Sequence, residues 1–485
     1  MSDLSLILQY ALAVVLVLLA LLSAQLLVLG FIRLFRPAPV VRRPQLPDEA
    51  LPHVLVQCPV RNEGALAVRV ATCAANFDWP QDKLHVQVLD DGDAETHEDL
   101  KRVILASVPA GIDVQVMKRA DRTGFKAGNL SFGLAHSEAP FVAVFDADFE
   151  PAADFLRQTV PALVADQGLC FVQARWGHAN RETNWLTRTQ GCLLDSHFAV
   201  EQEARFRAGL PMSFNGTAGV WRRAAIDHAG GWTGDTLTED LDLSVRCALK
   251  GWRGAFVSDV VAPGELPETA AAWRAQQARW TKGHAQCAKK LLPLVWASRL
   301  PLTTKAAMTL QMCQFGFYTL AFISAVISLG LMYIGAEYLP AVSSLGLFVT
   351  GFGIGSSVAY VWLGQKLLGR ERMIGLHRSL LLSVVFPSGL VLSNAKATWN
   401  AYFASPHSMN FTRTLRSGER YAGGWRGVPE LIAGLFLPAF AFAESVWSLP
   451  FFVFAVTGLI SIGAMGFSGA AVPPANGTRL IAPKE

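Results

Sequence analysis

The chain has 485 residues, of which 52% are hydrophobic and only 16% are charged, against roughly 25% charged residues in an average soluble protein. The formal net charge of +4 is too small to indicate nucleic-acid binding, so no nucleic-acid partner is expected. The apolar residues are concentrated towards both ends, and residues 50–300 between them have the charge density of a soluble domain.

The first apolar stretch, residues 4–32, contains no charged residue and is long enough for one α-helix to cross a bilayer. Its apolar core is longer than that of a cleaved signal peptide, and basic residues follow rather than precede it, which favours a membrane anchor. The positive-inside rule places Arg33 and the arginines after it in the cytoplasm and the N-terminus outside. Several prolines in residues 34–50 then predict an extended linker.

In the central part, short apolar segments alternate with helical segments, which predicts βαβ units and a mostly parallel sheet. The expected strands include residues 54–58, 85–89, 114–117, 141–145, 171–174 and 220–221. Ligands of open α/β sheets bind at the carboxyl ends of the strands. The polar residues that follow these strands are therefore candidates for one shared site.

The apolar run 141–145 leads directly into Asp146 and Asp148. A D-x-D pair at a strand end can hold one hard divalent cation against phosphate oxygens, although a solvated turn would also explain it. Between the third and fourth strands, Lys126 lies between two glycines, in a loop that can approach a phosphate closely.

Two further motifs come later in the central part. Thr238 is a candidate N-cap, and the acids Glu239 and Asp240 follow it, either favouring the helix N-terminus or facing a cleft as a general base. Gln276, Arg279 and Trp280 have the i, i+3, i+4 spacing that places them on one helix face. That face could bind sugar and phosphate, or it could lie at the membrane surface.

The C-terminal third is apolar again. Residues 306–336 and 338–365 are uncharged and predict a transmembrane hairpin whose two ends are cytoplasmic. Residues 379–395 are marginal in length for a span, which favours an interfacial or re-entrant segment. Residues 428–468 predict two more helices, so that five spans would leave the C-terminus in the cytoplasm.

Together the motifs resemble those of membrane-embedded processive family-2 glycosyltransferases, the cellulose synthases and cellulose-synthase-like β-glycan synthases. The resemblance rests on segments 59–64, 90–92, 126–129, 146–148, 215–217, 238–240 and 276–280. It implies an α/β fold, namely a nucleotide-sugar-binding domain of glycosyltransferase A type, with a mostly parallel sheet, inserted between transmembrane α-helices. Residues 411–418 are similar to the gating loop of that family, with Phe411, Thr412, Arg413 and Thr414 as its first residues.

The resemblance also implies roles for individual residues. Asp240 would be the catalytic base, with Glu239 and Thr238 beside it in the motif. The donor nucleotide would be bound by Pro59, Glu63, Asp90, Asp91, Lys126, Asn129, Asp146, Gln276 and Arg279. Asp146 and Asp148 would hold Mg2+ or Mn2+. The acceptor would be bound by Trp280, Asn215 and Gly216.

The implied activity is inverting, metal-dependent polymerisation of a β-glucan or β-mannan. The donor would be UDP-glucose or GDP-mannose, and the growing polysaccharide would be the acceptor. The chain would be a multi-pass protein of the plasma or inner membrane in contact with lipid, with its catalytic domain in the cytoplasm and with accessory export subunits as further possible partners. Two alternatives remain open: transfer of one sugar to a lipid, and a non-catalytic channel or scaffold subunit of an exporter.

These inferences divide the chain into eight segments. We expect a first transmembrane helix at 1–33, a linker at 34–50, the glycosyltransferase domain at 51–265, interfacial helices at 266–305, a transmembrane hairpin at 306–366, an interfacial segment with the gating-like loop at 367–427, two transmembrane helices at 428–468 and a tail at 469–485.

Overall fold

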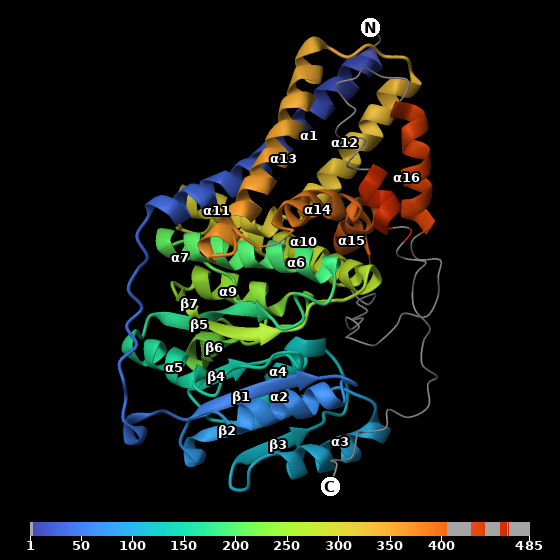
Figure 1. Cartoon of the computed structure of the whole chain (residues 1–485). Coiled ribbons are helices and arrows are strands. Elements are labelled where there is room, and N and C mark those ends of the chain that lie inside the picture. The colour runs from blue at the N-terminus through green and yellow to red at the C-terminus, as the bar shows by residue number, and fades with distance from the viewer. Residues whose placement is uncertain (1–2, 374, 405–427, 442–455, 463, 465–485) are drawn as a thin grey trace.

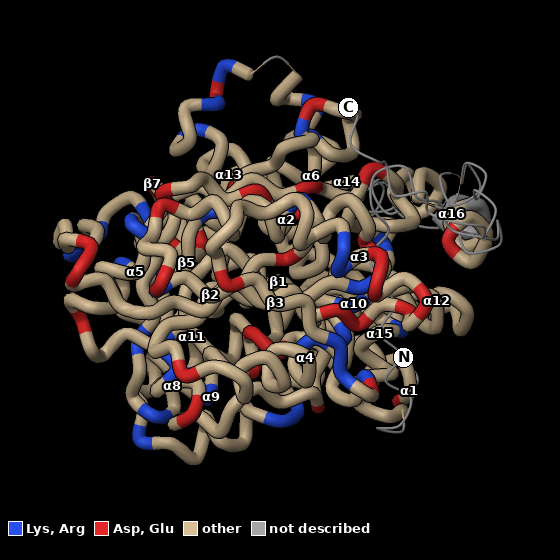
Figure 2. Tube along the Cα trace, turned by 90° about the horizontal axis from the view of Figure 1, so that it is seen from below, with Lys and Arg blue, Asp and Glu red and all other residues tan. Residues whose placement is uncertain are grey.

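The computed structural model describes residues 3–373, 375–404, 428–441, 456–462 and 464. Figure 1 shows two parts, a sheet with its helices below and a group of long helices above. The linker after the first helix runs down the side of the molecule and enters the sheet at its first strand. Seen from the sheet end, Lys and Arg residues are interspersed with Asp and Glu residues along the chain trace (Figure 2).

A seven-stranded sheet is the centre of the lower part, in the order β3-β2-β1-β4-β6-β5-β7. The strands are β1 (Val54–Val60), β2 (Leu84–Asp90), β3 (Asp113–Met117), β4 (Phe141–Val144), β5 (Leu169–His178), β6 (Gly219–Arg222) and β7 (Arg253–Gly264). Only β6 runs antiparallel to its neighbours β4 and β5, so the mostly parallel sheet expected from the sequence is confirmed. β7 was not among the expected strands.

Helices cover both faces of this sheet. Successive side chains of a strand point to opposite faces, so each buried strand presents apolar side chains to both layers of helices. Val54 and Val56 of β1 pack on one face with α2 (Ala65–Ala75), α3 (Ala94–Ser107) and α5 (Phe155–Ala165). Leu55 points to the other face, where α4 (Phe125–Leu134), α8 (Arg223–His228) and α9 (Glu239–Leu249) pack.

Two long helical segments lie between the sheet and the upper helices (Figure 1). The first is continuous through α6 (Trp185–Ser196), a π-helical stretch (His197–Gln202) and α7 (Glu203–Ala208). The second is α10 (Ala270–Ala297), whose N-cap is Thr269; the side-chain oxygen of Thr269 accepts a 3.2 Å hydrogen bond from the Ala272 nitrogen. These two segments therefore lie at the junction of the lower and the upper part of the molecule.

Among the residues that the structure describes, three helices of the upper part are long and apolar enough to cross a membrane: α1 (Asp3–Phe35), α12 (Gly316–Tyr333) and α13 (Pro340–Leu367). α1 packs against both α12 and α13 through buried leucine and valine side chains. α14 (Leu376–Ser388) and α15 (Val391–Phe403) form a pair bent by 48°, the geometry of a broken span or a re-entrant loop. α16 (Val428–Ala441) follows, and much of the segment expected to form two last spans lies outside the described residues.

One helix differs from the sequence expectation. The uncharged stretch 306–336 is not a single arm of a hairpin, because α11 (Leu302–Cys313) ends before α12 begins at Gly316. Met308 and Met312 of α11 pack on Cys287 and Leu291 of α10. Composition alone could not reveal this break, since it follows from the packing of α11 against the helix below.

Candidate active site

A cavity of about 570 Å³ lies between the carboxyl edge of the sheet and the upper helices. Its walls come from the ends of β1 and β4, from α4, α9 and α10, and from parts of α1, α12, α13 and α14. With one exception, every site residue expected from the sequence within the described part of the chain lines it. These residues are Pro59, Glu63, Asp91, Lys126, Asn129, Asp146, Asp148, Asn215, Gly216, Thr238, Glu239, Asp240, Gln276, Arg279 and Trp280.

The exception is Asp90, the last residue of β2. Its carboxylate accepts a 2.7 Å hydrogen bond from the Gly92 nitrogen and lies 2.7 Å from His97 Nδ1, so it does not face the cavity. Asp91 does line the cavity, and Arg119 donates to both of its carboxylate oxygens at 2.7 Å. The structure thus distinguishes two neighbouring acids that the sequence could not tell apart.

Arg119 also holds the loop that leads into α4. Its guanidinium donates to the carbonyl oxygens of Thr123 at 2.6 Å and Phe125 at 2.8 Å. A side chain at Gly128 would collide with this loop, because an added Cβ would lie 2.0 Å from the Thr123 oxygen. The requirement for glycine at this position therefore comes from close backbone packing, which brings Lys126 to the cavity wall.

Lys126 is a cation of the cavity wall and contacts three of its oxygen atoms. Its ammonium nitrogen donates to Asp146 Oδ1 at 2.7 Å and to the Gly216 carbonyl at 2.8 Å, and lies 3.6 Å from Glu239 Oε1. Burial alone would lower the pKa of Lys126, but the charges of Asp146 and Glu239 raise it above its ordinary value. Lys126 is therefore a permanent positive charge beside the D-x-D pair.

Asp146 and Asp148 follow β4 and both line the cavity. The Asp146 nitrogen donates to Thr217 Oγ1 at 2.9 Å, which fixes the turn at the strand end. The described residues contain no group of three or more metal-ligating side chains. Two carboxylates with hard oxygen atoms nonetheless suit a divalent cation whose other ligands are phosphate oxygens and water.

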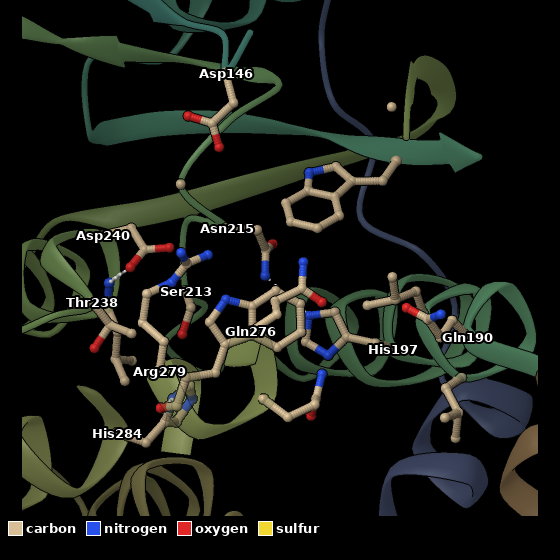
Figure 3. Close-up of a pocket in the computed structure, with 18 of the residues that line it drawn as sticks. Asp146, Gln190, His197, Ser213, Asn215, Thr238, Asp240, Gln276, Arg279 and His284 are labelled. Atoms are coloured by element: carbon tan, nitrogen blue, oxygen red, sulfur yellow. Dashed lines mark hydrogen bonds between the residues drawn. The ribbon is translucent and has the colours of Figure 1, made fainter. Parts of the chain in front are cut away.

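Asp240 lies in the first turn of α9, half-buried at the cavity wall (Figure 3). Its Oδ1 accepts a 2.8 Å hydrogen bond from the Leu241 nitrogen, while Oδ2 faces Gly216, where an added Cβ would lie only 3.1 Å away. Burial and the charge of Glu239 raise the pKa of Asp240 to about 7, against the opposing effect of Lys126. A carboxylate with this pKa can accept a proton near neutral pH.

The helix start next to Asp240 differs in one detail from the expectation. Thr238 occupies the N-cap position of α9, but its side chain makes no capping hydrogen bond. Its hydroxyl lies 3.3 Å from the Cys287 sulfur of α10 instead. The predicted N-cap position is therefore confirmed, but the side-chain capping hydrogen bond is missing because the Thr238 hydroxyl packs against α10.

The motif on α10 does form one face, as its spacing predicts: Gln276, Arg279 and Trp280 all line the cavity. Figure 3 shows Arg279 beside Asp240, and Gln276 lying towards Asn215. Farther along α10, His284 also lines the cavity, and burial lowers its pKa to about 4, so the ring is neutral at pH 7. The indole and polar groups of this wall are suited to bind a sugar.

Sequence reasoning missed several cavity residues. Arg122 lines the cavity, and His197 and Glu201 line it from the π-helical stretch. Only Arg122 had a sequence signal, as a basic residue close to the loop around Lys126. The gating-like loop with Phe411 to Thr414 lies outside the described residues.

The chain is similar to known glycosyltransferases. Residues 141–354 match the family model described as glycosyl transferase family group 2. The chain is 42% identical over 253 residues to a glucomannan 4-β-mannosyltransferase 1 of Oryza sativa subsp. japonica, covering 51% of this chain and 49% of that protein. It is 40% identical over 261 residues to glucomannan 4-β-mannosyltransferase 9 of Arabidopsis thaliana, covering 53% of this chain and 49% of that protein.

The chain spans about half the length of these curated relatives. Among solved structures, the mannosyltransferase PcManGT from Pyrobaculum calidifontis, in complex with GDP-Man and Mn2+, superposes with a TM-score of 0.56 at 20% identity. The match covers 81% of this chain and 99% of that one, and shows a shared fold. Residues 141–354 therefore match a family-2 glycosyltransferase domain, and the chain is similar to glucomannan 4-β-mannosyltransferases over about half of its length.

Proposed function

We propose that the protein transfers mannose from GDP-mannose to a hydroxyl of a β-linked glycan, with inversion at the anomeric carbon. The observation that carries this proposal is the place of Asp240, whose pKa is about 7. Asp240 lines the same cavity as Lys126, which we assign to the donor half, and Trp280, which we assign to the acceptor half. The names of the relatives support mannose and a 4-linkage, and the structure of PcManGT with GDP-Man supports the donor.

The donor would bind across the carboxyl edge of the sheet. Its nucleoside would lie near Asp91 and Asn129, with Pro59 and Glu63 at the end of β1 beside it. Its diphosphate would lie near Lys126, Arg279 and the D-x-D pair. Asp146 and Asp148 would hold Mg2+ or Mn2+, which offsets charge on the diphosphate when bound.

Asp240 would act on the acceptor. Its carboxylate takes the proton of the acceptor hydroxyl as the hydroxyl oxygen forms a bond to the anomeric carbon of the donor. The bond from that carbon to the diphosphate oxygen breaks, and its electrons leave with the nucleoside diphosphate. Lys126 and Arg279 stabilise the negative charge on the departing group. One displacement of this kind turns an α-linked donor into a β-glycoside.

The extent of the cavity supports a polymer as product. Its wall continues from the sheet edge to Ser23 and Gln25 of α1, Tyr318 of α12 and Tyr360 of α13. A polysaccharide leaving Trp280 would find polar and aromatic groups between helices that are long enough to cross a membrane. We therefore propose that the chain is a membrane protein that extends the glycan and passes it across the bilayer, with the sheet domain in the cytoplasm.

The alternative of a single transfer to a lipid predicts the same donor but a product of one added sugar, so product length separates the two. A non-catalytic role fits poorly with a cavity that gathers the acids, Lys126 and Arg279 at one place.

The substitution Asp240→Asn tests the proposed base. We expect transfer to fall about 10²–10⁴-fold, the usual contribution of a general base, while GDP-mannose still binds. Asp235→Asn is the matched control, because Asp235 is an exposed acid close to the same helix and pairs with Lys290 at 2.8 Å. Retained turnover in Asp240→Asn would exclude this base assignment.

A further inference from the structure

The π-helical stretch His197–Gln202 interrupts an otherwise regular helix directly at the cavity. A π-helical turn contains one extra residue, changes which side chains share a face, and occurs frequently at functional sites. Here it places both His197 and Glu201 on the cavity wall. Neither residue belongs to the motifs discussed above.

A chain of hydrogen bonds fixes the orientation of each polar group around His197. Gln202 Nε2 donates to the Ser213 carbonyl at 2.8 Å, which fixes its amide, and it also donates to Asn215 Oδ1. The Asn215 nitrogen Nδ2 must therefore be the atom 3.0 Å from His197 Nε2. An amide nitrogen can only donate, so His197 Nε2 accepts.

The other ring nitrogen then carries the proton. His197 Nδ1 lies 3.1 Å from Glu201 Oε2 and donates to it. Burial alone would raise the pKa of Glu201, but the hydrogen bonds from His197 and Arg205 and the charge of Arg205 lower it below its ordinary value, so the carboxylate is charged. Arg205, which is almost fully buried, donates to the second oxygen at 3.1 Å. Glu201, His197 and Asn215 thus form one ordered series, which we call the Glu201–His197–Asn215 relay.

The relay ends next to the reacting groups. Asn215 precedes Gly216, whose carbonyl accepts from Lys126 and whose Cα faces Asp240 Oδ2. Figure 3 shows the Asn215 side chain between Asp240 and His197. Only one of the two N–H groups of Asn215 Nδ2 is needed for His197, and the other can donate to a ligand in the cavity.

We propose that His197 and Glu201 are positioning residues that direct the second Asn215 N–H to a hydroxyl of the terminal acceptor sugar. That hydroxyl neighbours the one that Asp240 deprotonates, so the contact fixes which hydroxyl is presented for attack. The inference rests on the proposed function and adds a determinant of acceptor binding. It involves no contact with the donor nucleotide.

Two substitutions of His197 separate this role from a structural one. The side-chain oxygen of glutamine can take the place of Nε2, so His197→Gln keeps an acceptor for Asn215. The side chain of asparagine is shorter and reaches only the position of Nδ1. His197→Asn therefore keeps a hydrogen-bond partner for Glu201 but loses the hydrogen bond to Asn215. If His197 had only a structural role, both variants would lose transfer activity to the same extent. Alternatively His197→Asn would lose less, because it keeps a partner for the buried Glu201 carboxylate.

The measurement is the ratio of mannosyl transfer to hydrolysis of GDP-mannose, in the purified full chain with a mannose oligosaccharide acceptor and Mn2+. We expect the ratio to fall, and the acceptor KM to rise, about tenfold in His197→Asn, the size of one neutral hydrogen bond. His197→Gln should stay close to wild type, and hydrolysis of the donor by water should be unchanged in both. His228→Asn is the control, because His228 pairs with Trp252 at 3.0 Å, outside the cavity.

Asn215→Ser provides an independent test if His197→Asn does not fold. It removes the amide and leaves the His197–Glu201 pair in place. It should lower the ratio of transfer to hydrolysis about as much as His197→Asn. The inference is overturned if transfer and hydrolysis fall together in His197→Asn, if both His197 variants behave alike, or if neither changes the ratio. A wild-type protein that releases no GDP from GDP-mannose would contradict the proposed function itself, and the inference with it.

Discussion

The ammonium nitrogen of Lys126 lies 2.7 Å from Oδ1 of Asp146, so the cation of α4 and the first acid of the D-x-D pair are direct partners. A divalent cation that takes Asp146 as a ligand would compete with Lys126 for the same oxygen. The Gly216 carbonyl, 2.8 Å from the ammonium, would keep Lys126 near the donor phosphates when that happens. Metal and donor binding should therefore be coupled through Lys126.

This coupling predicts the effect of Asp146→Asn. Loss of one carboxylate ligand should raise the Mn2+ concentration for half-maximal GDP release about tenfold or more. A titration of activity with Mn2+ measures the change. Glu150→Gln is the matched control, because Glu150 lies two residues beyond Asp148 but pairs with Arg69 at 2.8 Å. An unchanged activation curve for Asp146→Asn would exclude Asp146 as a ligand.

The pH dependence of the reaction should report on Asp240. A general base works only when deprotonated, so kcat/KM should rise with pH through the pKa of about 7 and level off above it. The charge of Glu239 contributes to that raised pKa, so Glu239→Gln should move the rising limb to lower pH. A pH profile of initial rates for both proteins is sufficient. A limb that stays in place, or that moves to higher pH, would contradict this electrostatic account.

Close contact between α9 and α10 predicts the effect of Gly283→Ala. An added Cβ would lie 2.5 Å from Thr238 Cγ2 and 2.8 Å from its oxygen, so the helices must separate. We expect a loss of about 1–3 kcal/mol in unfolding free energy and reduced transfer, because Asp240 would shift relative to Trp280. Denaturant unfolding and initial rates measure both effects.

The control for this substitution is Gly330→Ala in α12, since no atom lies within 4 Å of the added Cβ. If the two alanine variants behaved alike, contact between α9 and α10 would not limit the position of Asp240.

A buried carboxylate outside the cavity should matter for stability. Asp195 of α6, which is almost fully buried, pairs with Arg181 and with Arg370, whose Nη1 lies 2.5 Å away, and it lies 3.4 Å from His178. Burial would raise the pKa of Asp195, but these three groups hold it below its ordinary value. Asp195→Asn would leave Arg181 without its buried charge partner and should cost about 3–5 kcal/mol in unfolding free energy.

The control is Asp259→Asn, because Asp259 forms an exposed pair with Arg43 at 2.7 Å, and exposed pairs contribute about 1 kcal/mol or less. Unfolding midpoints in detergent compare the two variants. Equal midpoints would mean that the ion pairs of Asp195 do not stabilise the connection between α6 and the loop after α13.

Most of the site could be predicted from the sequence because its residues follow strands. The run before Asp146 is apolar throughout, as expected of a buried strand, and the sheet topology then brings Asp146 next to Lys126 and Gly216. The helical spacing of Gln276, Arg279 and Trp280 was sufficient to place them on one wall.

The remaining features depend on tertiary contacts. Asp90 and Asp91 look equivalent in the sequence, and only the strand geometry turns Asp90 towards His97. The π-helical stretch that brings His197 to the cavity has no signature in composition or periodicity. Thr238 fits the pattern of an N-cap, yet packing against α10 gives its hydroxyl a different partner.

Donor turnover tests the central claim most directly. The purified full chain in detergent, with Mg2+ or Mn2+, would be offered GDP-mannose, UDP-glucose, UDP-N-acetylglucosamine and UDP-galactose separately, and nucleoside diphosphate release and product size followed. The account predicts GDP release from GDP-mannose and a polymer that a β-1,4-mannan hydrolase degrades. No release from any donor, by protein shown to be folded, would contradict it.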